Sequence, residues 1–168
     1  MSIFYMFNKP KSSIIGLLFI VLTLWLSACG KTAQGIGSDA ELKQIMTIGT
    51  QDNQLAFDKS TLRAQSGERI ELTFANNSTA FAHNWVLVDD GKSVADLVYQ
   101  EALMAGEKNN FLPKDTSALL TQTALIPAGN QETISFTAPA IPGSYTFLCT
   151  YPGHYLAGMT GTLTVSAP

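Results

Sequence analysis

The residues best suited to chemistry lie close together near the C-terminal end of this 168-residue chain. Cys149 begins the segment Cys-Thr-Tyr-Pro-Gly-His-Tyr-Leu-Ala-Gly-Met, which contains His154 and ends at Met159. Pro152 and Gly153 are typical turn residues, so the chain is expected to reverse between the cysteine and the histidine. A thiolate, an imidazole and a thioether are therefore expected on successive loops at one end of the fold.

The chain has one other histidine, His83, which stands immediately before the segment Asn-Trp-Val-Leu-Val. If His83 lies at the same end of the fold, two imidazoles, one thiolate and one thioether converge. Two histidines and a cysteine with a weak methionine ligand are typical of electron-transfer copper sites, because sulfur suits Cu(I) and imidazole suits both oxidation states. We therefore predict one copper ion bound by His83, Cys149, His154 and Met159. Zinc is an alternative, although it would gain little from the thioether.

Other uses of these residues stay open at this point. A lone buried cysteine is most often an inert apolar residue, and a single methionine or histidine often only fills the core. A thiol enzyme is another alternative, with Cys149 as nucleophile, His154 or His83 as base and Asn84 as the residue that orients it. That chemistry leaves Met159 without a role. In addition, Cys149 is expected in a buried strand, whereas the pKa of a reactive thiol is commonly lowered at an exposed helix N-terminus. An exported copper-storage domain is a third alternative.

Short strands must position these side chains. Apolar residues alternate with polar ones in several segments separated by turn residues, as expected for strands with one buried face. The alternating apolar positions are Ile70, Leu72 and Phe74, then Ile134 and Phe136, then Tyr145, Phe147 and Cys149, and finally the segment 162–165. Residues 85–88 are all apolar, which predicts a central strand with Trp85 in the core. The pattern predicts an all-β sandwich.

One segment departs from strand periodicity. Between Ser93 and Ala105 the apolar residues recur at helical spacing. Ser93 is a residue type that commonly caps a helix N-terminus. We predict one short helix inserted between strands, followed by a long connection up to Thr123 that covers one side of the sandwich.

The first 28 residues have the features of a secretory signal peptide. Lys9 and Lys11 precede an uncharged run of 13 residues from Ile14 to Leu26. This run is shorter than the roughly 20 residues of a membrane-spanning helix. Cys29 follows Leu-Ser-Ala, which resembles the lipobox at which bacterial lipoproteins are cleaved and lipidated. We predict a lipoprotein signal peptide at 1–28, a lipidated N-terminus and flexible tether at 29–44, and a single domain at 45–168.

Composition and charge narrow the choice of partners. Without residues 1–28 the chain carries 8 Lys and Arg against 13 Asp and Glu, a net charge of −5. This acidic balance argues against nucleic-acid binding, which usually requires a basic face. A lipidated Cys29 would leave Cys149 without a disulfide partner. We expect a monomeric, exported domain.

Two segments resemble the azurin-type cupredoxins, which are type 1 (blue) copper proteins. They are His83-Asn-Trp-Val-Leu and Cys149-Thr-Tyr-Pro-Gly-His, the latter followed by Met159-Thr-Gly-Thr-Leu-Thr-Val. The likeness covers essentially all of residues 45–166. Four residues separate His154 from Met159, instead of the three found in azurins. This spacing makes the chain more similar to the auracyanins, membrane-attached blue copper proteins of filamentous green phototrophic bacteria.

The resemblance implies a Greek-key β-sandwich of about eight strands, with a helical flap at residues 93–105. It also implies a weak contact to copper from the carbonyl of Ala82. Hydrogen bonds to the thiolate are expected from the backbone N–H groups of Asn84 and Tyr151. The azurin disulfide is missing, because no cysteine lies between Cys29 and Cys149.

The expected activity is one-electron transfer by the Cu(II)/Cu(I) couple, with no substrate turned over. An apolar patch of Pro152, Tyr155, Leu156 and Ala157 is expected to surround the edge of His154 and to dock weakly on partners. The lipid anchor favours c-type cytochromes or membrane-bound respiratory or photosynthetic complexes as those partners. It would hold the domain on the outer face of the cytoplasmic membrane or in the periplasm, with the outer membrane as an alternative.

Overall fold

The structure, a computed structural model, describes residues 43–89 and 91–168. The predicted signal peptide, Cys29 and most of the predicted tether lie outside these residues. The first strand, β1 (Lys43–Gly49), begins two residues before the predicted start of the domain. None of the helices in the part of the chain that the structure describes has both the length and the apolar character of a membrane-spanning segment.

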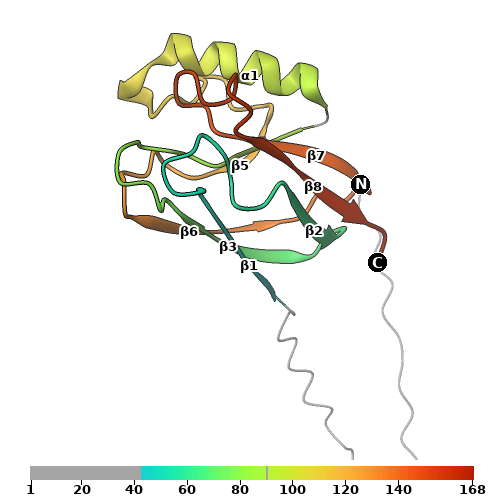
Figure 1. Ribbon diagram of the computed structural model, residues 1–168. Helices are drawn as coiled ribbons and strands as arrows, with labels where there is room; N and C mark the ends of the chain where they lie inside the picture. Colours follow the sequence, from blue (N-terminus) through green and yellow to red (C-terminus); the bar gives the residue numbers. More distant parts are fainter. Residues whose placement is uncertain (1–42, 90) are drawn as a thin grey trace, which may run out of the picture. The chain divides into compact units, whose positions relative to one another are not determined.

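Eight strands in the described part of the chain form two sheets (Figure 1). The smaller sheet has the order β1, β3 (Arg69–Ala75) and β6 (Gln131–Thr137). The larger sheet has the order β2 (Thr61–Gln65), β8 (Thr160–Ser166), β7 (Gly143–Leu148), β4 (Val86–Val88) and β5 (Leu119–Gln122). The β1–β3 and β2–β8 pairs are parallel, and the other neighbouring strands are antiparallel. The predicted all-β sandwich is confirmed.

The alternating sequence pattern corresponds to the core between the two sheets. In β3, Ile70, Leu72 and Phe74 are buried, while the residues between them are partly exposed. They belong to one core cluster with Trp85 and Phe147 from the side of the larger sheet. Every second side chain of β3 therefore points into the core, as period-two alternation requires.

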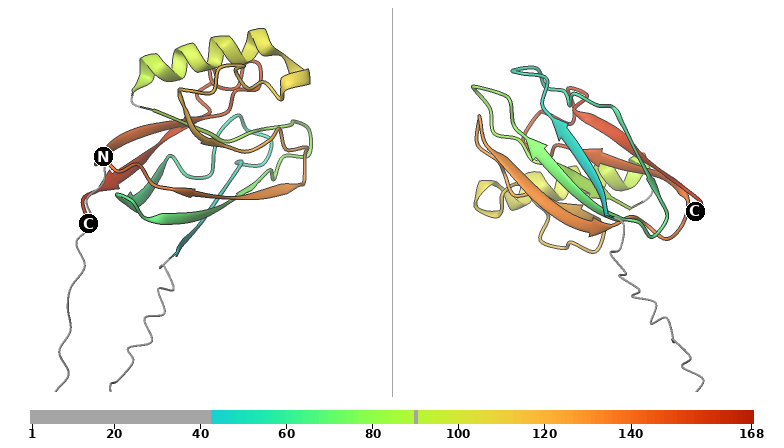
Figure 2. Two further views of the ribbon diagram at one scale, coloured as in Figure 1. Left: turned by 180° about the vertical axis from the view of Figure 1, so that it is seen from behind. Right: turned by 90° about the horizontal axis from the view of Figure 1, so that it is seen from below.

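Strand β4 is apolar at every position because both of its faces are covered. Leu87 belongs to the core between the sheets, whereas Val86 and Val88 pack with Val98 and Tyr99 of helix α1 (Lys92–Ala105). Figure 2 shows the helix lying across the outer face of the larger sheet. The helix therefore adds a third layer to the sandwich.

The predicted helix is confirmed, but its predicted cap is wrong. The helix begins at Lys92, its N-cap residue is Gly91 with a φ of 86°, and no side chain makes a capping hydrogen bond. A glycine suits this position because a positive φ costs little without a Cβ. Ser93 therefore lies inside the first turn.

The predicted long connection after the helix contains two elements. They are the 3-10 helix Glu107–Asn109 and the strand β5. The sequence pattern misses β5 because this short edge strand, which pairs with β4 alone, has no alternation of buried and exposed residues.

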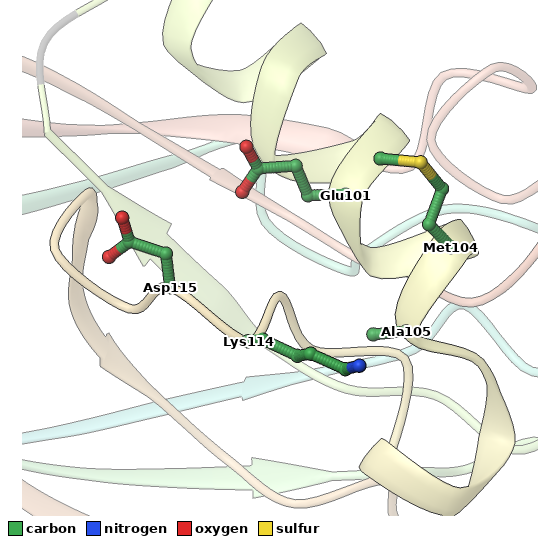
Figure 3. A pocket seen from close by; sticks show the side chains of 5 residues that line it. All are labelled: Glu101, Met104, Ala105, Lys114 and Asp115. Atoms are coloured by element: carbon green, nitrogen blue, oxygen red, sulfur yellow. The ribbon is translucent and has the colours of Figure 1, made fainter.

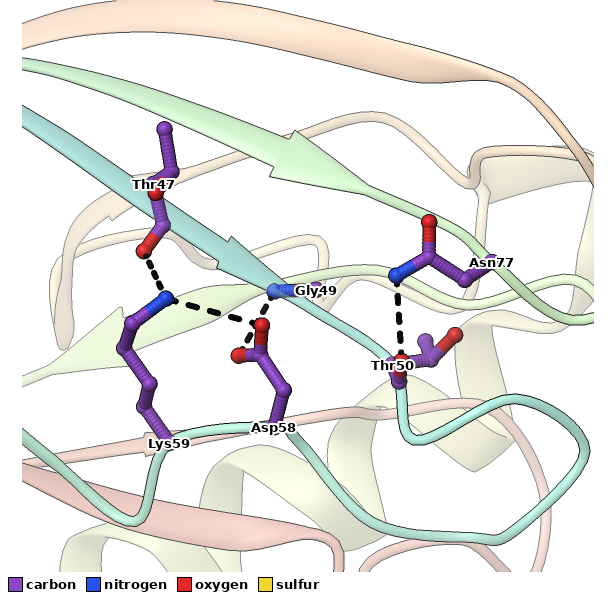
Figure 4. Close-up of polar contacts among 6 residues, drawn as sticks. All are labelled: Thr47, Gly49, Thr50, Asp58, Lys59 and Asn77. Atoms are coloured by element: carbon purple, nitrogen blue, oxygen red, sulfur yellow. Dashed lines mark hydrogen bonds and ion pairs between the residues drawn. The ribbon is translucent and has the colours of Figure 1, made fainter.

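Polar contacts fix the loops that join the strands of the smaller sheet. The Asp58 carboxylate accepts a hydrogen bond from the Gly49 N–H at 2.9 Å, and Asn77 Nδ2 donates to the Thr50 carbonyl at 3.2 Å (Figure 4). The end of β1 is thereby bonded both to the segment before β2 and to the loop after β3. That second loop leads to His83.

Candidate metal centre

Two of the predicted ligands are fixed by neighbouring strands. Cys149 follows the last residue of β7, Met159 precedes the first residue of β8, and the two strands pair with each other. The Cys149 N–H donates to the Met159 carbonyl at 3.1 Å, which extends the pairing by one bond. Both side chains are fully buried in the core between the sheets. Strand pairing therefore holds the two sulfur atoms at the same end of the sandwich.

The two predicted histidine ligands lie in loops. His83 forms a backbone bridge with Ile126, in which each residue donates one hydrogen bond to the other. His154 lies in the turn between β7 and β8, where its N–H donates to the Tyr151 carbonyl at 3.1 Å and its carbonyl accepts from the Met159 N–H at 3.0 Å. Both side chains are buried, with exposed fractions of 0% and 3%.

The donor atoms of these four residues converge. His83 Nδ1 lies 3.1 Å from His154 Nδ1 and 3.8 Å from Cys149 Sγ, and His154 Nδ1 lies 3.5 Å from the same sulfur. Met159 Sδ lies 3.2 Å from His83 Nδ1. The histidine and cysteine donors all fall within 4.8 Å of one another. The structure therefore brings together all four predicted ligands.

This spacing fits one metal ion. Bonds of about 2.0–2.3 Å to one ion bring its ligand atoms to within about 4 Å of one another. The three separations between the histidine and cysteine donors, 3.1, 3.5 and 3.8 Å, meet this condition. Two sulfur and two imidazole donors suit copper, and the cluster found among the described residues contains no carboxylate for a harder ion.

Burial sets the protonation of the ligands. It lowers the pKa of His83 to about 4, with the neighbouring His154 adding to the effect. Burial also lowers the pKa of His154, so both imidazoles are neutral at pH 7 and each offers a nitrogen lone pair. The pKa of the Cys149 thiol is raised to about 11, mainly by burial. The thiol therefore keeps its proton at pH 7 until a metal ion replaces it.

Two backbone groups donate hydrogen bonds to the Cys149 sulfur, namely the N–H groups of Asn84 and Tyr151. The Asn84 side chain holds them in place, because it donates to Thr150 Oγ1 at 2.7 Å and accepts from the Thr150 N–H at 2.8 Å. The loop before β4 and the cysteine loop are thereby bonded directly to each other. Ala82 is half-buried beside the first histidine, and the contact of its carbonyl with the ion stays a prediction.

The surface near the centre differs in part from the prediction. Three of the four predicted docking residues are exposed, namely Pro152, Leu156 and Ala157. The prediction is wrong for Tyr155, which is only 9% exposed because its side chain packs against helix α1. Phe81, which was not among the predicted residues, also lies beside the centre: it is 42% exposed, and its ring centre lies 5.9 Å from that of His154. The signal for Phe81 is an isolated aromatic residue among small and polar ones, two residues before a histidine.

The candidate centre is a packed part of the core. A hollow of about 310 Å³ lies elsewhere, at the C-terminal half of α1, and is lined by Glu101, Met104, Ala105, Lys114 and Asp115 (Figure 3). None of the four predicted ligands lines this hollow. The ligands pack against one another, which suits a bound ion better than an organic substrate.

Comparison with known sequences identifies the family. Residues 44–166 match the copper-binding proteins of the plastocyanin/azurin family. The chain is 39% identical over 119 residues to auracyanin-A of Chloroflexus aurantiacus. The aligned region covers 71% of this chain and 72% of that protein. It is 40% identical over 124 residues to auracyanin-B of the same bacterium, and this aligned region covers 73% of this chain and 52% of that protein.

Comparison with solved structures leads to the same family. The reduced auracyanin of the photosynthetic bacterium Roseiflexus castenholzii matches with a TM-score of 0.70 and 45% identity, over 73% of this chain and 97% of that one. The blue copper protein auracyanin A of Chloroflexus aurantiacus matches with a TM-score of 0.71 and 37% identity, over 74% and 100% of the two chains. The four converging residues are thus arranged like a type 1 copper site. The chain belongs to the plastocyanin/azurin family of copper-binding proteins, and within it to the azurin-like blue copper proteins that resemble auracyanins.

Proposed function

We propose that this protein is a one-electron carrier and that His83, Cys149, His154 and Met159 hold its copper ion. When bound, copper supplies the Cu(II)/Cu(I) couple. The observation that carries this proposal is the convergence of two imidazole nitrogens and one sulfur within 4.8 Å, in a buried cluster that also contains Met159.

The residues around the centre limit its movement. Cys149 and Met159 are held by paired strands, and His83 is held by a backbone bridge. Ligands fixed in this way rearrange little when the oxidation state changes, which favours fast electron transfer. The N–H groups of Asn84 and Tyr151 stabilise the charged form of the cysteine sulfur and so contribute to the reduction potential.

A thiol enzyme is the weaker alternative. Cys149 is fully buried, and burial raises the pKa of its thiol to about 11. At pH 7 the thiol would therefore keep its proton, so little of the nucleophilic thiolate would form. Met159 would also have no role in that chemistry. A storage role has less support, because the described residues show one such cluster, sufficient for a single ion.

The exposed apolar residues beside His154 form the proposed contact surface for redox partners. We call this surface the docking patch, and it consists of Phe81, Pro152, Leu156 and Ala157. The loops that carry the patch and both histidines, residues 76–84 and 149–159, contain no Asp, Glu, Lys or Arg. Docking through this patch would therefore be apolar, and a patch of four residues suits brief encounters with c-type cytochromes or membrane-bound redox complexes, which bury little area.

The docking patch is tested by Leu156→Ser. This variant is expected to exchange electrons with an oxidised c-type cytochrome about tenfold more slowly, because a buried leucine contributes roughly 1.5 kcal/mol to an apolar contact. Stopped-flow mixing with the reduced protein measures the rate. Leu97→Ser is the matched control, since Leu97 is also exposed, at 60%, but lies on helix α1. Equal rates for the two variants would remove the docking patch from the proposal.

The proposed location is outside the cytoplasm, at a membrane to which lipids on Cys29 attach a monomeric domain. The sequence Leu-Ser-Ala-Cys after a short apolar run supports this proposal. Two or more acyl chains give stable attachment, whereas one chain does not. Cys29→Ser is therefore expected to shift the protein from the membrane pellet to the soluble fraction, as measured by fractionation and immunoblotting. A variant that has lost residues 1–28 and still remains in the pellet after a salt wash would show that lipids on Cys29 are not the anchor.

A further inference from the structure

One of the four ligands is held differently from the rest. Cys149 and Met159 are bonded to each other at the ends of paired strands, and His83 is bonded to Ile126 in a two-bond bridge. His154 lies within residues 151–158, a stretch of turns that contains no strand, and its backbone hydrogen bonds to Tyr151 and Met159 stay within the same loop. Strand pairing therefore does not fix the place of this imidazole.

Helix α1 is hydrogen-bonded to the chain on both sides of His154. On the N-terminal side, the Gly153 N–H donates to Tyr99 Oη at 2.7 Å. On the C-terminal side, Tyr155 Oη donates to Asp96 Oδ1 at 2.8 Å. Figure 1 shows the red turn between β7 and β8 lying directly beneath the helix. The histidine thus stands between two residues that the helix holds.

The two helix residues form one contact surface. Asp96 and Tyr99 are three positions apart, so their side chains leave the same face of the helix. Tyr99 and Tyr155 are both buried, with ring centres 5.3 Å apart. Lys92 Nζ donates to both oxygens of Asp96, at 2.8 and 2.9 Å, and so orients the carboxylate that accepts from Tyr155.

We propose that Asp96 and Tyr99 form a clamp that positions His154 at the copper ion; this inference rests on the proposed copper-binding function. Gly153 and Tyr155 are the immediate neighbours of the histidine, so a displacement of either one moves the imidazole. Asp96 and Tyr99 act through these neighbours and are positioning residues.

The clamp affects the two oxidation states unequally. Cu(I) is stable with fewer ligands than Cu(II), so a loosely held His154 favours the reduced state. Loss of the clamp is therefore expected to raise the reduction potential. It is also expected to speed the release of Cu(I) to a chelator, because the histidine leaves the ion more readily.

The first test compares Tyr99→Phe with Tyr145→Phe in the copper-loaded protein. Tyr145 is also a buried tyrosine, and its Oη donates to the Ile141 carbonyl at 2.7 Å near the opposite end of β7 from Cys149. Both variants lose one tyrosine hydroxyl, so similar melting temperatures are expected. Only Tyr99→Phe is expected to raise the potential and to release Cu(I) to bathocuproine about fivefold faster, the factor that corresponds to one typical hydrogen bond.

The second test uses the other arm of the clamp. Asp96→Asn keeps an oxygen that accepts from the Tyr155 hydroxyl, whereas Asp96→Ala does not. Asp96 is only half-buried, so both variants are expected to fold. Asp96→Ala is expected to raise the potential and the release rate as Tyr99→Phe does, and Asp96→Asn is expected to retain wild-type values.

The outcomes separate the clamp from the proposed function. The clamp is supported if the reduction potential and the rate of Cu(I) release differ between Tyr99→Phe and Tyr145→Phe, or between Asp96→Ala and Asp96→Asn. It is overturned if both quantities are equal within each of these two pairs. If Tyr99→Phe does not fold, the Asp96 pair decides. A wild-type protein that shows no visible band from sulfur to Cu(II) would instead overturn the proposed copper function, before any variant is compared.

Discussion

Removal of copper is expected to lower the melting temperature of this protein by about 15 °C. His83 lies far along the chain from Cys149, His154 and Met159, so unfolding breaks up the full ligand set and the ion binds the folded state much more tightly than the unfolded chain. Such a ligand adds about 4 kcal/mol to the free energy of unfolding when its free concentration is 1,000 times its Kd. In a domain of this size, about 1 kcal/mol shifts the melting temperature by about 4 °C.

Calorimetric scans of the apo and copper-loaded forms measure this shift. Cys149→Ser is the control, because it removes the sulfur that both histidine nitrogens approach. The copper-dependent shift in this variant is expected to fall to a few degrees. Cys149 is free, so no disulfide involving it complicates the comparison. Identical melting temperatures for the two wild-type forms would show that the site does not bind copper tightly.

The apo protein is expected to lose about 3 kcal/mol of its free energy of unfolding between pH 7 and pH 4 through His83. Burial lowers the pKa of this imidazole from 6.5 to about 4 in the folded protein. The unfolded chain therefore takes up a proton first as the pH falls. The stability associated with neutral His83 is complete above pH 6.5 and is lost as the pH approaches 4. The pKa of His154 is also lowered by burial, so this residue acts in the same direction.

Urea unfolding of the apo protein at several pH values measures this effect, with His83→Gln as the matched variant. Glutamine does not titrate, so the difference between the two proteins isolates His83 from the carboxylates that also protonate near pH 4. The wild type is expected to lose stability faster than the variant as the pH falls from 7 to 4. Parallel pH profiles would show that His83 is not a buried neutral imidazole in the apo fold.

The sequence predicts the core strands and the ligands because both depend on local patterns. Ile70, Leu72 and Phe74 alternate with polar residues, and burial at every second position follows. The uniformly apolar segment around Leu87 similarly predicts a strand covered on both faces. The ligands were identifiable because a chain with two histidines has one of them five residues after a cysteine.

The features that the sequence did not predict depend on contacts between distant segments. Tyr155 follows a histidine in a turn, and nothing local indicates that helix α1 covers it. Phe81 gains its importance from a ring contact with His154, which lies far along the chain. The cap at Gly91 depends on backbone geometry, so the common capping residue Ser93 gave the wrong prediction. Strand β5 forms because β4 offers an edge, and its own residues show no alternation.

Copper titration of the purified apo protein, followed by visible absorption, tests the copper centre most directly. We expect an intense charge-transfer band from the Cys149 sulfur to Cu(II) that reaches its maximum at one copper per chain. The band is expected to be absent in Cys149→Ser. A colourless wild-type complex, or copper bound only as loosely as by a surface histidine, would mean that these four side chains do not form a blue copper centre.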